Sequence, residues 1–167
     1  MRLPNAKLIW SILALGSLGL VVATFIMTAK LNLHPCHLCI LQRLLFMLLG
    51  GFALLAAFFS RSLFGRLMGI LAIVSAGTGI GVAGYQVWLQ AQPVDPFSCT
   101  SGTPELVEHI VDWLGQKAPA LFMPTGLCQE VELRIMTLSL AGWGVILFSA
   151  ALLVGLVALW RSGRKRN

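Results

Sequence analysis

The sequence predicts an all-α membrane protein built as a bundle of four transmembrane helices. Of its 167 residues, 57% are hydrophobic, and the mean hydropathy is +0.86, too apolar for the surface of a soluble domain. The apolar residues fall in four runs, each close to the ~20 residues that a helix needs to cross a bilayer. Basic residues gather at the ends of these runs, where they act as topology signals. We therefore expect a single integral membrane domain over residues 1–167.

The first run competes with a cleavable signal peptide. It covers residues 8–29, whereas the apolar core of a signal peptide has about 7–15 residues. The stretch from Met27 to Lys30 is also a poor cleavage site. We therefore interpret this run as a helix, and the four predicted spans are 8–29, 40–59, 67–89 and 138–160.

The basic residues predict the orientation. Eight flank the spans on one side: Arg2, Lys7, Arg61, Arg66, Arg161, Arg164, Lys165 and Arg166. Four remain for the other side: Lys30, Arg43, Lys117 and Arg134. Because the basic-rich side stays in the cytoplasm, both termini and the 60–66 turn are predicted to be cytoplasmic. The dispersed charges and the lack of a basic-aromatic stretch argue against a nucleic-acid partner, while the basic tail fits contact with anionic membrane lipid.

The cysteines all fall in the predicted outer loops, 30–39 and 90–137. Cys36 and Cys39 lie in the short loop, and Cys99 and Cys128 lie in the long one, with all six acidic residues. Disulfides form and persist on the translocated side of a membrane. A loop of nearly fifty residues is usually functional or disordered.

The long loop contains one predicted helix. Thr103 is expected as its N-cap and Pro104 at its first helical position. Apolar residues follow at helical spacing: Leu106, Ile110, Trp113 and Leu114. We prefer a short amphipathic helix on the membrane surface, which would anchor the loop so that its cysteines approach the other pair. A helix packed against the bundle, with no role in chemistry, has equal support.

The third run carries two small-residue spacings, Gly65-x-x-x-Gly69 and Gly77-x-x-x-Gly81. Such spacings let helix backbones approach closely in a membrane. We expect these glycines to pack within the bundle, in preference to forming a homodimer.

The stretch HPCHLC, residues 34–39, holds the most informative motif. Four cysteines allow three pairings, and the Cys-x-x-Cys spacing favours Cys36 with Cys39, which leaves Cys99 with Cys128. So small a ring is seldom used for stability and often for exchange. Pro35 supports a helix start here, where N-terminal amides favour a thiolate.

Arg43 lies four residues after Cys39, on the same helix face. An arginine in mid-span costs about 2.5 kcal/mol or more, so it needs a partner. Either it reaches the lipid headgroups, or it stabilises an anion such as a thiolate or the oxygen of a reduced quinone, which we favour. Gln42 beside it would donate a further hydrogen bond or face another helix.

Metal and haem sites are not predicted. Four side chains of the motif can serve as zinc ligands: His34, Cys36, His37 and Cys39. Four ligands within six residues, however, do not readily close a tetrahedron around one ion. A c-type haem needs a histidine directly after the second cysteine, where this sequence has Ile40.

Over essentially the whole chain, the sequence resembles the DsbB family of disulfide bond formation proteins of the bacterial inner membrane. The resemblance is carried by the stretch PCHLCILQR, the four spans with both termini inside, and the later pair of outer-loop cysteines. It implies a thiol:quinone oxidoreductase that reoxidises a periplasmic, DsbA-like thioredoxin-fold partner. The electrons would pass to ubiquinone or menaquinone in the membrane quinone pool.

Carried over by position, the resemblance assigns roles to the cysteines. A thiolate of the partner would attack Cys99, Cys128 would exchange with Cys36, and Cys39 would face the quinone. Arg43 matches the family's quinone-proximal arginine.

One segment departs from some members of that family. They carry a histidine near the end of the third span, whereas residues 85–88 here read YQVW. Arg43 is therefore the better candidate for binding a quinone. Trp88 is a further candidate that would stack near the quinone ring, although we favour a place in the interfacial aromatic belt.

Two other functions compete. A quinone-linked oxidoreductase of the vitamin K epoxide reductase type also combines a Cys-x-x-Cys with loop cysteines, but in the reverse order along the chain. A non-enzymatic membrane protein with structural disulfides would explain why all four cysteines fall in the predicted outer loops. It would explain neither the small ring nor Arg43.

Overall fold

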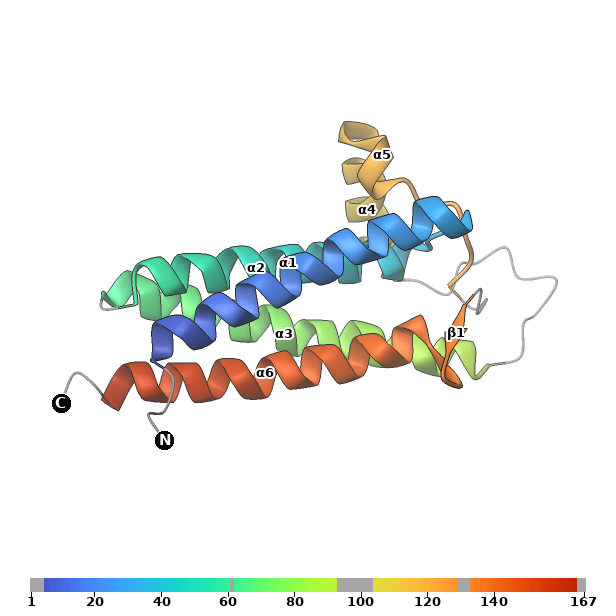
Figure 1. The fold of residues 1–167 in the computed structure, drawn as a ribbon. Coiled ribbons are helices and arrows are strands. Elements are labelled where there is room, and N and C mark those ends of the chain that lie inside the picture. Colours follow the sequence, from blue (N-terminus) through green and yellow to red (C-terminus); the bar gives the residue numbers. More distant parts are fainter. Residues whose placement is uncertain (1–4, 61, 93–103, 129–132, 165–167) are drawn as a thin grey trace.

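Four long helices form the body of the protein (Figure 1). The computed structural model describes residues 5–60, 62–92, 104–128 and 133–164. The four helices are α1 (Ala6–Leu31), α2 (His37–Phe58), α3 (Leu63–Gln90) and α6 (Leu140–Arg164). All four are long and apolar enough to cross a membrane, which confirms the predicted fold class of four long apolar helices. Their bounds lie within a few residues of the predicted spans.

The helices pack in a closed square. α2 lies against α1 and α3, and α3 lies against α6, whereas α1 and α6 pack less closely. Helix α1 begins and helix α6 ends at the same end of the bundle (Figure 1). We call this the inner end, and the end where α2 begins the outer end.

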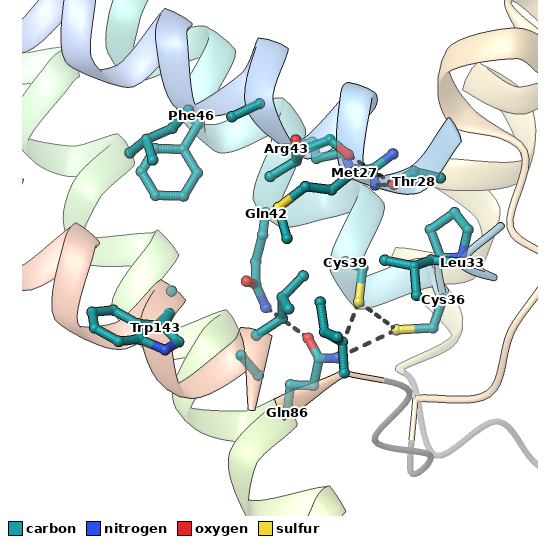
Figure 2. A pocket seen from close by; sticks show the side chains of 18 of the residues that line it. Met27, Thr28, Leu33, Cys36, Cys39, Gln42, Arg43, Phe46, Gln86 and Trp143 are labelled. Carbon is teal, nitrogen blue, oxygen red and sulfur yellow. Dashed lines mark hydrogen bonds between the residues drawn. The ribbon is translucent and has the colours of Figure 1, made fainter. Parts of the chain in front are cut away.

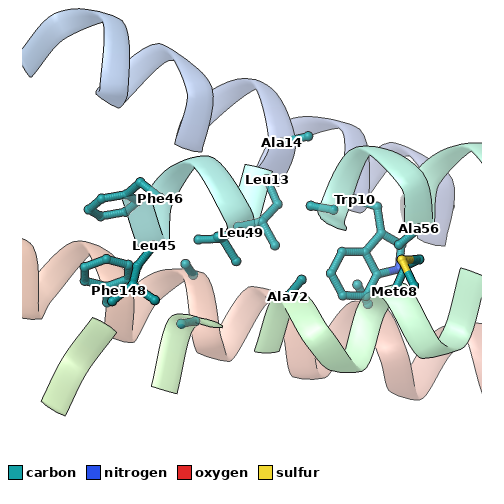
Figure 3. Packing of buried hydrophobic residues seen from close by; sticks show 14 of the residues in the cluster. Trp10, Leu13, Ala14, Leu45, Phe46, Leu49, Ala56, Met68, Ala72 and Phe148 are labelled. Atoms are coloured by element: carbon teal, nitrogen blue, oxygen red, sulfur yellow. The ribbon is translucent and has the colours of Figure 1, made fainter. Parts of the chain in front are cut away.

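Small residues let the large core side chains interlock. Phe46 of α2 stacks on Phe148 of α6 with ring centroids 3.8 Å apart (Figure 3). A Cβ built on Gly79 would lie 2.4 Å from the Phe148 ring, so this glycine makes room for it. Gly69 makes similar room for Trp10, which is 2% exposed. These contacts confirm glycine-mediated packing within the bundle.

The Gly77-x-x-x-Gly81 pair behaves differently from the prediction. A Cβ at either position would meet nothing within 4 Å. The reason is that the buried stripe of α3 runs through Ala76, Gly79 and Ala83, which turns Gly77 and Gly81 outward. The prediction of bundle packing was therefore wrong for this pair.

The outward faces of the helices are apolar. Large apolar side chains are exposed there on several helices, among them Ile12, Leu15, Leu67, Val74 and Leu153. Exposed apolar surface on this scale needs lipid to cover it.

Two short helices project from the outer end (Figure 1). These are α4 (Glu105–Lys117) and α5 (Pro119–Phe122). The carbonyl oxygen of Pro104 accepts the backbone N–H of Val107 at 2.8 Å, so Pro104 is the N-cap of α4. The helix thus begins one residue later than predicted, and Thr103 lies outside the described residues.

Helix α4 has two apolar faces. Val111 is fully buried and packs in a cluster with Ile40 of α2 and Phe122 of α5. Leu106 and Trp113, which belong to the predicted apolar face, are instead 71% and 59% exposed. Leu114, which also belongs to the predicted face, packs against that cluster. The contact of α4 with the bundle is therefore centred on Val111, which the sequence analysis did not select, and includes one edge of the predicted face.

A β-hairpin precedes α6 and was not predicted. Strand β1 (Arg134–Ile135) pairs antiparallel with β2 (Leu138–Ser139). The two residues between the strands, Met136 and Thr137, have φ of 51° and 71°. Positive φ at both central positions is what a type I′ two-residue hairpin turn requires. The hairpin occupies the start of the predicted fourth span, which is why α6 begins at Leu140.

Candidate active site

The Cys-x-x-Cys pair lies where α2 begins. Cys36 has extended backbone, with φ −84° and ψ 171°, and is the N-cap. Its carbonyl oxygen accepts the N–H of Ile40, which closes the first turn and carries Cys39 back toward it. The two Sγ atoms are 3.1 Å apart, within thiol hydrogen-bonding distance. The predicted proximity of these cysteines is thus a result of one helical turn.

Cys128 joins this pair through backbone contacts between two loops. The N–H groups of Thr125 and Gly126 donate to the Pro35 carbonyl oxygen at 2.9 and 3.3 Å. A Cβ on Gly126 would lie 2.0 Å from the His34 carbonyl oxygen, so only glycine permits this approach. Cys128, 1% exposed, then packs in one buried cluster with Cys36.

We name Cys36, Cys39 and Cys128 the cysteine cluster. The fourth cysteine, Cys99, lies outside the described residues.

The hydrogen bonds of the cluster shift the pKa values of Cys36 and Cys128 in opposite directions. Cys36 hydrogen-bonds to Cys128, and this lowers the pKa of Cys128, with help from the amides of Leu38 and His37. The same bond, together with burial, raises the pKa of Cys36 to about 12. The start of α2 was expected to favour a thiolate within the Cys-x-x-Cys pair. The Cys39 amide does lower the pKa of Cys36, but the bond to Cys128 and burial outweigh it. The amides of Leu38 and His37 act on Cys128, because the long loop places that sulfur beside the helix N-terminus.

Two glutamines connect the cluster to the bundle (Figure 2). Gln86 of α3 donates from Nε2 to Cys39 Sγ at 3.1 Å and to Cys36 Sγ at 3.5 Å. Gln42 donates from Nε2 to Gln86 Oε1 at 2.7 Å, so it faces another helix. The sequence analysis missed Gln86. One sequence signal could have found it: Gln86 continues the stripe of small buried residues on α3, which runs through Ala76, Gly79 and Ala83.

Arg43 is held by the end of α1. Its Nη2 donates to Thr28 Oγ1, and its Cζ lies 5.0 Å from the centre of the Phe25 ring. Arg43 and Thr28 both line a pocket beside the cysteines (Figure 2).

That pocket has a volume of about 280 Å³ and lies among the outer halves of the four long helices. Its lining is mostly apolar, and its polar members gather beside the cysteines, including Gln42, Arg43 and Gln86. A second, apolar cavity of about 190 Å³ lies between α1 and α6, nearer the inner end. The two share lining residues: Leu20, Phe46 and Leu147. The two cavities are therefore neighbours, and we call them together the apolar track, which leads from the cysteine cluster toward the seam between α1 and α6.

Trp88 lies apart from this track. It is 55% exposed on α3 and pairs with the Tyr85 ring at 5.7 Å. The pocket instead receives a tryptophan from α6, Trp143.

The motif histidines have other contacts. His37 Nε2 lies 3.2 Å from Asp112 Oδ1, which ties the start of α2 to α4. Within the described part of the chain, no three His, Cys, Asp or Glu side chains are grouped to hold a metal ion.

The fold and the cysteine cluster together define a class of protein, a helical membrane protein that handles thiols and disulfides. The family model of disulfide bond formation protein DsbB matches residues 6–158. The chain therefore belongs to the DsbB family, which confirms the resemblance found in the sequence.

Curated relatives agree. Disulfide bond formation protein B of Dechloromonas aromatica is 37% identical over 155 residues, which cover 91% of each chain. The protein of the same name from Marinobacter nauticus is 36% identical over 164 residues, 98% of this chain and 97% of its own. That of Nitrosococcus oceani is 33% identical over 135 residues, 80% and 77% of the two chains. The protein is thus a multi-pass membrane oxidoreductase of disulfide bond formation.

Proposed function

We propose that the protein is a thiol:quinone oxidoreductase of the bacterial inner membrane. It would reoxidise a DsbA-like thioredoxin-fold protein in the periplasm and pass the electrons to ubiquinone or menaquinone. The observation that carries this proposal is the position of the cysteine cluster. It lies at the outer end of an apolar track that continues into the seam between α1 and α6.

The relay begins with two thiols of the partner protein. A partner thiolate attacks Cys99 of a Cys99–Cys128 disulfide, and Cys128 leaves as a thiolate. The partner's second thiol then displaces Cys99 from the mixed disulfide. The partner is now a disulfide, and Cys99 and Cys128 hold the two electrons it lost.

The second exchange uses the described geometry. The Cys128 thiolate attacks Cys36 of a Cys36–Cys39 disulfide, so that a Cys36–Cys128 bond forms and Cys39 is released as a thiolate. Cys99 then attacks Cys128, which restores the Cys99–Cys128 disulfide and leaves Cys36 and Cys39 reduced. The lowered pKa of Cys128 and its packing on Cys36 support this order.

The track fits a quinone. Its polar end offers Arg43, and the N–H of Gln42 that is not used by Gln86, as donors to a quinone oxygen, and its apolar length suits an isoprenoid tail. When bound, a quinone supplies an acceptor for the two electrons and two protons that leave the Cys36/Cys39 dithiol. Within this arrangement Arg43 provides positive charge beside the sulfur atoms, and Thr28 fixes its direction. Trp88 lies outside the proposed quinone site because it faces away from the track.

Quinone reduction tests the proposal. Purified protein would be mixed with a reduced DsbA-like partner and a short-chain ubiquinone or menaquinone analogue, and ultraviolet absorbance would follow the quinone. We expect turnover that disappears in Cys39→Ser and Cys99→Ser. In Arg43→Ala we expect an increase in the quinone KM of about tenfold or more, as for loss of a hydrogen bond from a charged group.

The thermal transition of each variant serves as the control for folding. Folded protein that gives no turnover with either quinone type and several partners would contradict the proposal.

A further inference from the structure

Two buried amides stand between the cysteine cluster and the core of the bundle. Gln86 is 3% exposed and Gln42 is 8% exposed. Burying an amide in an apolar environment is costly unless its groups are hydrogen-bonded. Here each amide has a partner, and the chain of hydrogen bonds ends on sulfur (Figure 2).

We infer that Gln86, oriented by Gln42, is a positioning residue that stabilises Cys39 as the thiolate released when Cys36 pairs with Cys128. This inference deepens the proposed function and takes the order of exchange from it. The two glutamines act as a pair, which we call the amide pair.

The amide pair has a direction that the chemistry requires. A thiolate only accepts hydrogen bonds, so the NH₂ group of Gln86 must face Cys39. Its oxygen then faces Gln42 and needs a donor, which the NH₂ group of Gln42 supplies at 2.7 Å. A carboxylate at position 42 could not supply it, because an ionised carboxylate has no hydrogen to donate.

The surrounding helices leave space for this arrangement. A Cβ on Gly144 of α6 would lie 2.8 Å from Gln42 Oε1 and 3.4 Å from the Ala83 Cβ. Adding that methyl group would displace the end of the Gln42 side chain while the backbone stays in place. Gly144→Ala is therefore a mild way to disturb the amide pair without removing either glutamine.

The step concerned is an exchange with no net oxidation. The Cys36–Cys39 bond breaks, the Cys36–Cys128 bond forms, and one thiolate, Cys128, is replaced by another, Cys39. A donor on Cys39 favours the product of this exchange. Loss of the donor shifts the equilibrium back to the Cys36–Cys39 pairing.

The test measures that equilibrium directly. Full-length Cys99→Ser protein with one disulfide has three possible pairings, and the test compares two of them, Cys36–Cys39 and Cys36–Cys128. The protein would be equilibrated in detergent with a trace of small thiol, quenched in acid, alkylated and mapped by peptide mass spectrometry. Neither quinone nor partner is present, so the result is independent of the quinone and partner assays.

We expect Gln86→Leu to lower the ratio of Cys36–Cys128 to Cys36–Cys39 by about tenfold, the effect of one hydrogen bond to a charged group. At a pH where residue 42 is ionised, Gln42→Glu, nearly identical in shape, turns the Gln86 oxygen toward Cys39 and should lower the ratio as much or more. Gln42→Leu removes the orienting donor without reversing the amide, so its effect should be smaller. Gly144→Ala should also lower the ratio.

Ser75→Ala is the matched control. It removes another buried polar group of α3, whose hydroxyl donates to the Leu71 carbonyl oxygen in its own helix, and should leave the ratio unchanged. If Gln86→Leu changes the ratio less than twofold, Gln86 does not stabilise Cys39. If Gln42→Leu has a larger effect than Gln42→Glu, the amide pair serves packing alone. Either result overturns the inference, and the isosteric Gln42→Glu variant decides it if Gln86→Leu fails to fold.

Discussion

Gly126 decides, at the scale of single residues, whether Cys128 can reach Cys36. A side chain at this position would overlap the His34 carbonyl oxygen, whose distance from the added Cβ is 2.0 Å. Because that atom belongs to the backbone, no side-chain movement relieves the clash. The loop must instead move away from the start of α2.

We therefore expect Gly126→Ala to slow partner-dependent turnover by tenfold or more, since a 1 Å misplacement of reacting groups can cost about 10²-fold. Stopped-flow oxidation of the reduced partner measures this. Gly77→Ala, where a Cβ meets open space, is the control and should leave the rate unchanged. An unaltered rate in Gly126→Ala would contradict the proposed docking of the loop.

The thiol of Cys36 controls the ionisation of Cys128. Its hydrogen bond is the main reason that the pKa of Cys128 is lowered. Cys36→Ala removes this donor, so the pKa of Cys128 should rise toward the ordinary thiol value near 8.5. The fraction of thiolate at neutral pH should fall accordingly.

Site-resolved alkylation of the reduced protein as a function of pH measures that change. The midpoint for Cys128 should move upward in Cys36→Ala, and a midpoint, unlike a rate, does not depend on access. Ser75→Ala, a buried hydroxyl of α3 outside the cluster, is the control and should leave the midpoint unchanged. A midpoint in Cys36→Ala that stays or moves downward would contradict the described hydrogen bond.

Helix α4 acts as an anchor at the scale of elements. Its buried residue, Val111, packs on Ile40 next to Cys39 and on Phe122 of α5. The chain runs from α5 directly into the segment that carries Cys128. Docking of α4 on α2 therefore limits how far Cys128 can move from the start of α2.

Val111→Asp should release this anchor, because a charge buried without a partner costs several kcal/mol. We expect faster limited proteolysis within residues 118–128 and slower partner oxidation, while the four long helices keep their thermal transition. Gln116→Asp adds the same charge to an exposed position of α4 and should have neither effect. Equal proteolysis of the two variants would show that α4 is not anchored through Val111.

The sequence predicted the long elements better than the short ones. A bilayer fixes the length and composition of a spanning helix, so four apolar runs were enough to find α1, α2, α3 and α6. The two-residue strands of the hairpin carry no periodic signal, and their turn, Met136-Thr137, lacks the Asn-Gly pattern typical of such turns. The buried residue of α4, Val111, was missed because this helix carries apolar residues on more than one face, so spacing alone did not identify the face that packs on the bundle.

The site was predictable only where it is local. The Cys-x-x-Cys spacing gave the contact between Cys36 and Cys39 because both lie within one helical turn. Gln86 bonds to Cys39 across 47 residues of sequence, and no spacing rule connects them. The effect of the α2 amides on Cys128 likewise depends on how the long loop docks.

At the scale of the whole molecule, two neighbouring cavities lead from the cysteine cluster toward the seam between α1 and α6. The second cavity lies between α1 and α6, and Ala150 is an exposed member of its lining. If the cavity holds an isoprenoid tail, a side chain that fills the cavity should weaken binding only of quinones that have a long tail.

Ala150→Phe should therefore raise the KM for a long-chain quinone several-fold and leave the KM for a short-chain analogue unchanged. Each buried CH₂ group contributes about 0.8 kcal/mol, so displacing even one isoprene unit is measurable. Leu153→Phe, an exposed position of α6 outside the cavity, is the control. Equal changes for both quinones would place the tail elsewhere.

The central claim is that electrons leave a partner dithiol through the cysteine cluster and reach a quinone. Its most direct test is the stoichiometry of the reaction in the absence of oxygen, with partner disulfides counted by thiol alkylation and reduced quinone by absorbance. We expect one quinone reduced for each partner disulfide formed, and neither product in Cys128→Ser. Partner oxidation without quinone reduction, or unchanged yields of both in Cys128→Ser, would contradict it.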